Sequence, residues 1–255
     1  MKKMPVVFIG HGSPMNAIEE NEYTRGWSDI AARIPTPEAI LVISAHWSVH
    51  GTRISDDPNP KTIYDMYGFP QELYNLQYSP AGAPALAHVT KELVGNAQID
   101  NSWGVDHGTW SILTKMYPNA DIPVFQMSVN QDLNAYEHFE IGKKLRLLRE
   151  KGVLIFGSGN VVHNLARVNW NMDGGYDWAV EFDNYIKDKI VKKEYKDVID
   201  YQKAGVIAEL SFMTSEHFDP LLYVLGASED ADKLSILNNS CTLGALSMTS
   251  YLFES

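Results

Sequence analysis

The sequence predicts a single α/β domain in which a central mixed β-sheet is covered by helices. Three features favour this class: short continuous apolar runs, amphipathic segments between those runs, and the lack of a Pro-, Gly- or Ser-rich linker that would divide the chain. With 255 residues, 45% of them hydrophobic, the chain is long enough to bury a large core. Ligands of such folds bind beyond the carboxyl ends of the strands, so we expect the active site there.

Strands and helices are predicted from the spacing of the apolar residues. Fully buried strands are continuous in apolar residues, which indicates strands at residues 6–9, 40–44, 123–129 and 153–156. Apolar side chains that recur every three or four positions predict amphipathic helices at residues 83–94 and 135–151. Further helices are expected at residues 160–167, 176–192 and 218–225, and a closing strand at residues 242–253.

Charge and cysteine content exclude several classes of partner. The net charge of −11 argues against a nucleic-acid partner and against an anionic membrane surface, since both require a basic protein surface. The single cysteine, Cys241, has no internal disulfide partner, which is typical of a reducing compartment. The first apolar run ends after Ile9, too early for a signal peptide, and no run approaches the roughly 20 residues of a membrane helix. We therefore expect a soluble, cytoplasmic protein.

Four of the eight histidines stand where a functional site is expected. His11 and His46 follow the first two apolar runs directly, and His163 follows the run at residues 153–156 through a short Gly-Ser-Gly-Asn-Val-Val segment. His217 stands at the start of a probable helix. Any one of them could be a hydrogen-bonded core histidine. Together they indicate a metal site, because imidazole is both a common metal ligand and the usual acid/base near neutral pH.

Other polar residues leave alternatives open. His107 could contact substrate or be oriented by Asp106, but Asp106 could equally be the N-cap of a helix that simply begins at His107. Ser158 lies between glycines but outside a Gly-x-Ser-x-Gly nucleophile motif, so a serine hydrolase is not supported. The remaining histidines, which occupy polar or helical contexts, are expected at the surface: His50, His88 and His138.

Five short motifs connect the chain to a known family. They are Gly10-His11-Gly12-Ser13-Pro14-Met15, Ser44-Ala45-His46-Trp47, Tyr64-Asp65-Met66-Tyr67-Gly68-Phe69-Pro70, Asp106-His107-Gly108-Thr109-Trp110 and Gly157-Ser158-Gly159-Asn160-Val161-Val162-His163-Asn164. Together they resemble the class III (LigB-type) extradiol ring-cleavage dioxygenases, and among these the 4,5-DOPA extradiol dioxygenase group. The motifs stand in family order, which implies one LigB-type catalytic domain over residues 1–255.

The resemblance implies roles for the histidines. His11 and His46 match metal ligands, and His163 matches the acid/base of ring-cleaving members, although in some zinc-containing relatives it stands against the metal as well. His107 matches a histidine that lines the active site. His217 occupies the position at which the better-studied branch has a glutamate ligand. The implied substrates are a catechol such as DOPA and O₂, and the implied cofactor is one divalent metal ion per chain.

The histidine at position 217 leaves the metal open between Fe²⁺ and Zn²⁺. Non-haem Fe(II) oxygenases usually combine two histidines with one carboxylate, whereas three neutral imidazoles favour zinc. Two other functions are therefore compatible with the sequence. One is a zinc hydrolase with Glu216 or Asp106 as base. The other is a non-enzymatic interaction protein of the same fold, which the four histidines disfavour.

Overall fold

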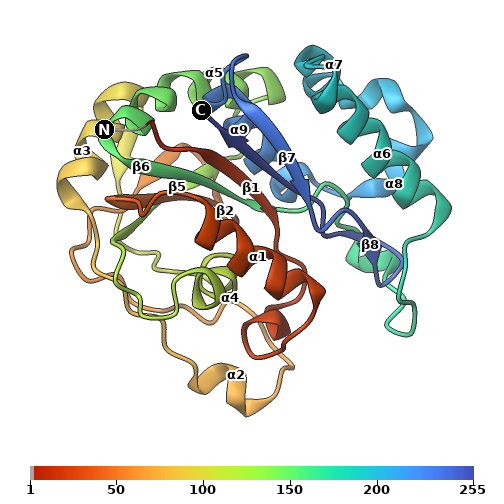
Figure 1. The fold of residues 1–255 in the computed structure, drawn as a ribbon, viewed down its shortest axis with the longest axis horizontal. Helices are drawn as coiled ribbons and strands as arrows, with labels where there is room; N and C mark the ends of the chain where they lie inside the picture. Colours follow the sequence, from red (N-terminus) through yellow and green to blue (C-terminus); the bar gives the residue numbers. More distant parts are fainter. Residues whose placement is uncertain (1–2) are drawn as a thin grey trace.

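One eight-stranded sheet forms the centre of the molecule in the computed structural model, which describes residues 3–255 (Figure 1). The strand order is β4-β3-β5-β2-β6-β1-β10-β7. Neighbours among β5, β2, β6 and β1 run parallel, whereas β10 is antiparallel to β1 and to the edge strand β7. The sheet is therefore mixed, as the sequence predicted. Its strands are β1 (Val6–Gly10), β2 (Ala39–Val49), β3 (Thr52–Ile54), β4 (Ala97–Ile99), β5 (Val124–Asn130), β6 (Val153–Gly159), β7 (Lys233–Leu237) and β10 (Ser250–Glu254).

Helices cover both faces of the sheet, so that the fold has three layers (Figure 1). Alternate residues of each central strand point to opposite faces. In β1, Phe8 packs with the layer that contains α5 and α9, whereas Ile9 packs with the layer that contains α1 and α4. The helices are α1 (Glu22–Arg33), α2 (Gln71–Asn75), α3 (Pro84–Val94), α4 (His107–Met116), α5 (Ala135–Leu145), α6 (Asp177–Val191), α7 (Tyr195–Ile199), α8 (Val206–Ser211) and α9 (Asp219–Ala227).

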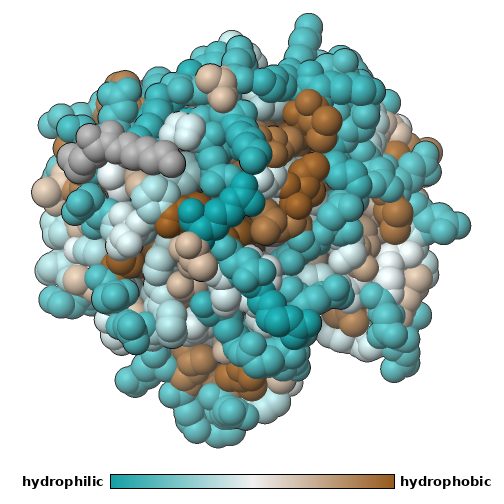
Figure 2. All heavy atoms as spheres, in the orientation of Figure 1, coloured by the Kyte–Doolittle hydropathy of each residue, from teal (hydrophilic) through white to brown (hydrophobic). Residues whose placement is uncertain are grey.

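The outer surface is mostly hydrophilic on the face that Figure 2 shows, with small apolar groups over the β7 edge and near α2. Leu234 and Ile236 of β7 are partly buried and pack against the core. Among residues 3–255, no helix combines the length and hydropathy needed to cross a bilayer.

One predicted element is wrong, and another is confirmed only at its end, where β10 forms. Residues 160–167 form no α-helix, only a short 3-10 turn at Leu165–Arg167. The backbone N–H of Asn160 donates to the His217 carbonyl and that of His163 to Ser211, so these groups pair with distant segments instead of with a helix. The predicted strand at residues 242–253 is interrupted, because Leu243 and Gly244 have positive φ and close a small hairpin of β8 (Cys241–Thr242) and β9 (Leu246–Ser247).

Two other predicted elements differ in their bounds. The helix expected at residues 135–151 changes to a 3-10 helix after Leu145 and stops at Gly152, which has a φ of 77°. The second strand runs beyond residue 44 and includes His46, so this histidine lies within β2 and not after it. The extension leaves the sheet locally irregular: β2 pairs with β6 only as far as Ser44, and its register against β5 shifts between Ser44 and Ser48. Such an irregularity can redirect a side chain out of the regular sheet.

Candidate metal centre

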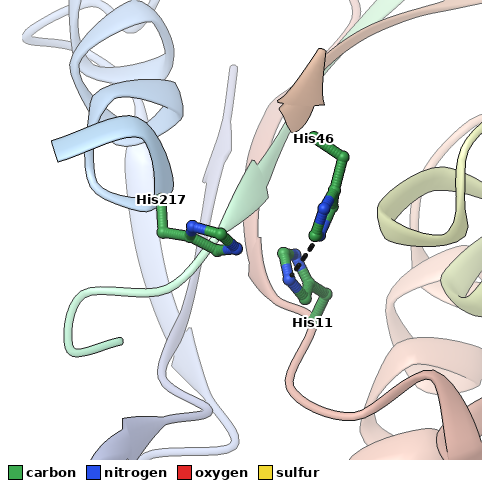
Figure 3. A group of neighbouring side chains, drawn as sticks. All are labelled: His11, His46 and His217. Carbon is green, nitrogen blue, oxygen red and sulfur yellow. Dashed lines mark hydrogen bonds between the residues drawn. The ribbon is translucent and has the colours of Figure 1, made fainter. Parts of the chain in front are cut away.

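Three histidines from distant parts of the chain meet at the carboxyl ends of the central strands (Figure 3). His11 follows β1, His46 lies in the irregular part of β2, and His217 ends the 3-10 helix η5 (Ser215–His217). Gly159 at the end of β6 lets η5 approach, since a Cβ built there would lie 2.1 Å from the His217 carbonyl oxygen. The β1-β6-β2 core therefore places all three side chains around one point.

The three imidazoles face one another through their Nε2 atoms. Nε2 of His46 lies 3.2 Å from Nε2 of His11. One ligand nitrogen from each of His11, His46 and His217 falls within 4.8 Å of the other two. Figure 3 shows the three rings converging from separate elements on a common space. His11 and His217 are buried, and His46 is largely buried.

Each of the three rings has a different partner at Nδ1. Nδ1 of His11 lies 3.0 Å from Ser158 Oγ, that of His46 lies 3.3 Å from Asp65 Oδ2, and that of His217 lies 3.1 Å from Glu216 Oε1. Ser158 Oγ itself donates to the Gly108 carbonyl, so towards His11 it can only accept. All three partners are thus acceptors, which places the proton on Nδ1 and leaves the Nε2 lone pair free for a metal.

The surroundings keep these rings uncharged. Burial, together with the neighbouring histidines, lowers the pKa of His11 and of His217 well below the usual value. Burial lowers the pKa of His46 to about 3, although the Asp65 carboxylate opposes that shift. Nε2 of His217 is buried and has no hydrogen-bond partner among the described residues. The three neutral imidazoles lie close together, and one of their inward nitrogens has no partner. This donor set fits a divalent metal ion and could hold one.

His163 lies against this group without joining it. Its ring stacks on that of His217, with the ring centroids 3.5 Å apart and 3° between the planes. It is not one of the three residues whose ligand nitrogens gather within 4.8 Å. Burial lowers the pKa of His163 to about 4, against the opposing effect of the Glu216 carboxylate.

The structure bears out the N-cap interpretation of Asp106, and the carboxylate beside the His107 ring is Asp65 and not Asp106. Asp106 is the N-cap of α4, because its side chain accepts from the Thr109 N–H. His107 begins the same helix, and its ring lies with its centroid 3.8 Å from that of His46. Asp106 is fully buried and also accepts from Ser44, Trp103 and Gln126, and burial raises its pKa. Its carboxylate is therefore committed to the fold.

Asp65 is the site residue that the sequence reasoning missed. Its Oδ2 lies 2.9 Å from Nδ1 of His107 and 3.3 Å from Nδ1 of His46. Burial raises its pKa, but the closeness of His107 and, to a smaller extent, of His46 outweighs burial and lowers the pKa overall. Asp65 lies in a segment without regular structure, so strand and helix patterns could not locate it. The only available signal was its place in the Tyr64–Pro70 motif.

The surface expectation for the other histidines is right for two of them. His50 and His88 are exposed, but His138 is buried. His138 lies on the face of α5 that packs against α9, where its ring stacks on Tyr223 and its Nε2 contacts the Asn130 carbonyl. Packing between two helices, which a single-helix pattern does not reveal, accounts for the error.

A cavity of about 650 Å³ opens beside Glu216, the residue that precedes His217. Its wall also includes Ser48, two residues beyond His46 in β2. A single aromatic ring with a short side chain fits within this volume. The lining residues are Ser48, Gln131, Leu133, Thr214, Ser215, Glu216 and Asp219.

Comparisons with known proteins extend over nearly the whole chain. Residues 5–254 match the family model described as the catalytic LigB subunit of aromatic ring-opening dioxygenase. The chain is 43% identical to 4,5-DOPA dioxygenase extradiol of Escherichia coli (strain K12), over 97% of this chain and 94% of that protein. It is 36% identical to a protein of the same description from Beta vulgaris, over 97% and 96% of the two chains. A crystal structure of an uncharacterized protein from Escherichia coli K12 superimposes with a TM-score of 0.85 at 40% identity, and covers 98% of this chain and 99% of that chain.

Proposed function

Because the chain belongs to the LigB family and is a ring-cleaving extradiol dioxygenase, we propose that it opens the ring of a catechol such as DOPA with O₂ at the His11–His46–His217 centre. The observation that carries this proposal is the convergence of the three Nε2 atoms, each with an acceptor at its own Nδ1. Relatives described as 4,5-DOPA dioxygenases support a catechol with an amino-acid side chain as the substrate.

His11, His46 and His217 would hold one divalent ion, Fe²⁺ or Zn²⁺. When bound, the ion supplies a Lewis-acidic template that brings catechol and O₂ together and passes electron density between them. The three protein ligands are neutral, and the negative charges nearest to them are the Asp65 and Glu216 carboxylates at Nδ1 of His46 and His217. Iron is the better match to ring cleavage with O₂, since zinc has no accessible redox change.

His163 is assigned the proton-transfer role, and not ligation. It is buried beside the centre, stacked on a ligand ring, and its own ring nitrogens remain outside the ligand set. A neutral imidazole there can accept a catechol proton and return it after ring opening, which is general acid/base work of about 10²–10⁴-fold. His107, in contact with His46 and at the start of α4, is placed to line the ring-binding side.

The hydrolase alternative has less support, because both candidate bases are engaged elsewhere. Asp106 accepts hydrogen bonds from four residues in the core, and Glu216 faces Nδ1 of His217. A base for water activation needs a free lone pair that points towards the bound water.

The test is reconstitution of the metal-free protein with Fe²⁺ or with Zn²⁺ under anaerobic conditions, followed by O₂ uptake against a panel of catechols. We expect O₂ uptake stoichiometric with catechol loss in the iron-loaded protein. Ester or amide turnover by the zinc-loaded protein without O₂ uptake would support the hydrolase instead.

A further inference from the structure

We propose that Asp65 is a positioning residue that fixes His46 and His107 together, so that one carboxylate orients both a metal ligand and the histidine that lines the ring-binding side. The inference rests on the proposed function, since that proposal makes His46 a metal ligand. It concerns a residue outside the histidine set, in a segment that carries no regular structure.

The contacts of Asp65 divide between its two oxygens. Oδ1 accepts from the backbone N–H of His107 at 2.9 Å. Oδ2 lies 2.9 Å from Nδ1 of His107 and 3.3 Å from Nδ1 of His46, which are ion-pair distances at angles outside regular hydrogen-bond geometry. The Asp65 side chain is largely buried, with 10% of it exposed, so water competes little for these contacts. One oxygen therefore holds the backbone where α4 begins, and the other holds two imidazoles.

A carboxylate oxygen between two Nδ1 atoms sets the tautomer of both rings. An ionised carboxylate only accepts hydrogen bonds, so each ring can satisfy it only with a proton on Nδ1. For His46 this leaves the Nε2 lone pair turned towards Nε2 of His11 and the metal position. For His107 it leaves Nε2 as the atom that can face a substrate. Carboxylates behind metal-bound histidines act in this way and raise metal affinity.

Asp65→Asn reverses this preference at almost unchanged volume. The Asn oxygen must stay where Oδ1 is, because the backbone N–H of His107 needs an acceptor there. The amide NH₂ then takes the place of Oδ2 and donates towards the two Nδ1 atoms. Each ring would respond by moving its proton to Nε2, the position at which His46 must bind metal. In a Ser-His-Asp triad, the same change from Asp to Asn costs about 10⁴ in kcat because the tautomer is wrong.

The first test measures metal binding and tautomer without turnover. Competition with a chromophoric chelator gives the zinc affinity of wild type, Asp65→Asn and a control, Asp56→Asn. Asp56 faces His88 at 3.1 Å in another Asp–His pair, on the surface away from the centre. We expect about 10–100-fold weaker zinc binding for Asp65→Asn and no change for Asp56→Asn. Long-range ¹H–¹⁵N spectra of the metal-free protein should show His46 and His107 moving from Nδ1–H to Nε2–H in Asp65→Asn alone.

The second test asks whether Asp65 acts through His107. In iron-saturated protein, kcat is measured for Asp65→Asn, His107→Phe and the double variant. We expect the double variant to turn over about as fast as the slower single variant, because both changes disable one unit. Additive losses in kcat, or unchanged zinc affinity and unchanged tautomers with the far-UV spectrum and Tm preserved, would overturn the proposal. Failure of the proposed function is distinguishable, since wild type itself would then bind no metal or consume no O₂.

Discussion

The imidazole of His163 lies flat against that of His217, with 3.5 Å between the ring centroids and 3° between the planes. Stacked rings present their nitrogens at their edges, so this contact gives His163 no share in the converging Nε2 atoms. The two residues differ in their surroundings as well: His217 has Glu216 at Nδ1, whereas the backbone of His163 is tied to Ser211. The stack therefore separates the proposed ligand His217 from His163, to which we assign the proton transfer.

Replacement of His163 tests that separation. In His163→Ala we expect metal content and metal affinity close to wild type, because the three ligands remain, but ring cleavage reduced by about 10²–10⁴-fold. Metal analysis and O₂-uptake rates give both values, and His50→Ala, which changes an exposed histidine, serves as the control. Loss of metal from His163→Ala would make His163 a ligand.

The acceptor behind His217 should contribute to metal affinity. Glu216→Ala removes the carboxylate that faces Nδ1 of His217 at 3.1 Å, so the ring loses its fixed tautomer and orientation. We expect the affinity for zinc to fall by about 10–100-fold. Glu209→Ala removes an exposed carboxylate from a neighbouring surface depression and should leave the affinity unchanged. Equal affinities for the two variants would show that Glu216 does not support the ligand.

The close approach of η5 to β6 should make Gly159 sensitive to a single methyl group. The Cβ of Gly159→Ala would lie 2.1 Å from the His217 carbonyl oxygen, a backbone atom that can move only with the ligand it carries. We expect destabilisation of about 1–3 kcal/mol, and weaker metal binding because His217 is displaced.

Gly174→Ala is the matched control for Gly159→Ala, since no atom lies within 4 Å of a Cβ built at Gly174. Urea unfolding and metal titration of both variants check the prediction. If Gly159→Ala matched Gly174→Ala in both measurements, the packing of η5 on β6 would not position the ligand.

The cluster of histidines could be predicted from the sequence, because imidazole is a common metal ligand and several of these residues follow predicted strands. His11 and His46 follow apolar runs that are recognisable as strands, and the carboxyl ends of parallel strands meet at one edge of a sheet. The central strands and the helices α3, α5, α6 and α9 follow equally from apolar periodicity. The resemblance implied that His217 takes the place of a carboxylate ligand and that His163 acts as the acid/base.

Residues whose place depends on tertiary contacts could not be foreseen. Asp65 reaches the site only when its segment folds back against the start of α4, where it accepts from the His107 backbone. His138 is polar by composition but buried by the packing of α5 on α9. The helix expected at residues 160–167 is absent because the Asn160 and His163 amides pair with distant carbonyls. Such contacts override local propensity.

The buried carboxyl of Asp183 should make stability depend on pH. Asp183 accepts from Ser247 and Thr249, yet burial outweighs these hydrogen bonds and raises its pKa. A raised folded-state pKa means that folding favours the protonated form. Stability is therefore lost as pH rises from the unfolded value of about 3.9 through the folded pKa.

Asp183→Asn removes that pH dependence, because it replaces the carboxyl group with an uncharged amide of similar shape. We expect wild type to lose stability relative to Asp183→Asn as pH rises above about 4, as measured by urea unfolding at each pH. A difference that moved in the opposite direction, with wild type gaining as pH rises, would mean that the folded state favours the charged carboxylate.

Incorporation of oxygen from ¹⁸O₂ is the most direct measure of the proposed reaction at the His11–His46–His217 centre. The iron-loaded protein is mixed with DOPA and ¹⁸O₂, the aldehyde product is reduced at once with borohydride to prevent exchange with water, and its mass is determined. The proposal predicts a ring-opened product that carries two ¹⁸O atoms, and no product when His46→Ala replaces wild type. A product with no ¹⁸O, or turnover that continues without O₂, would contradict it.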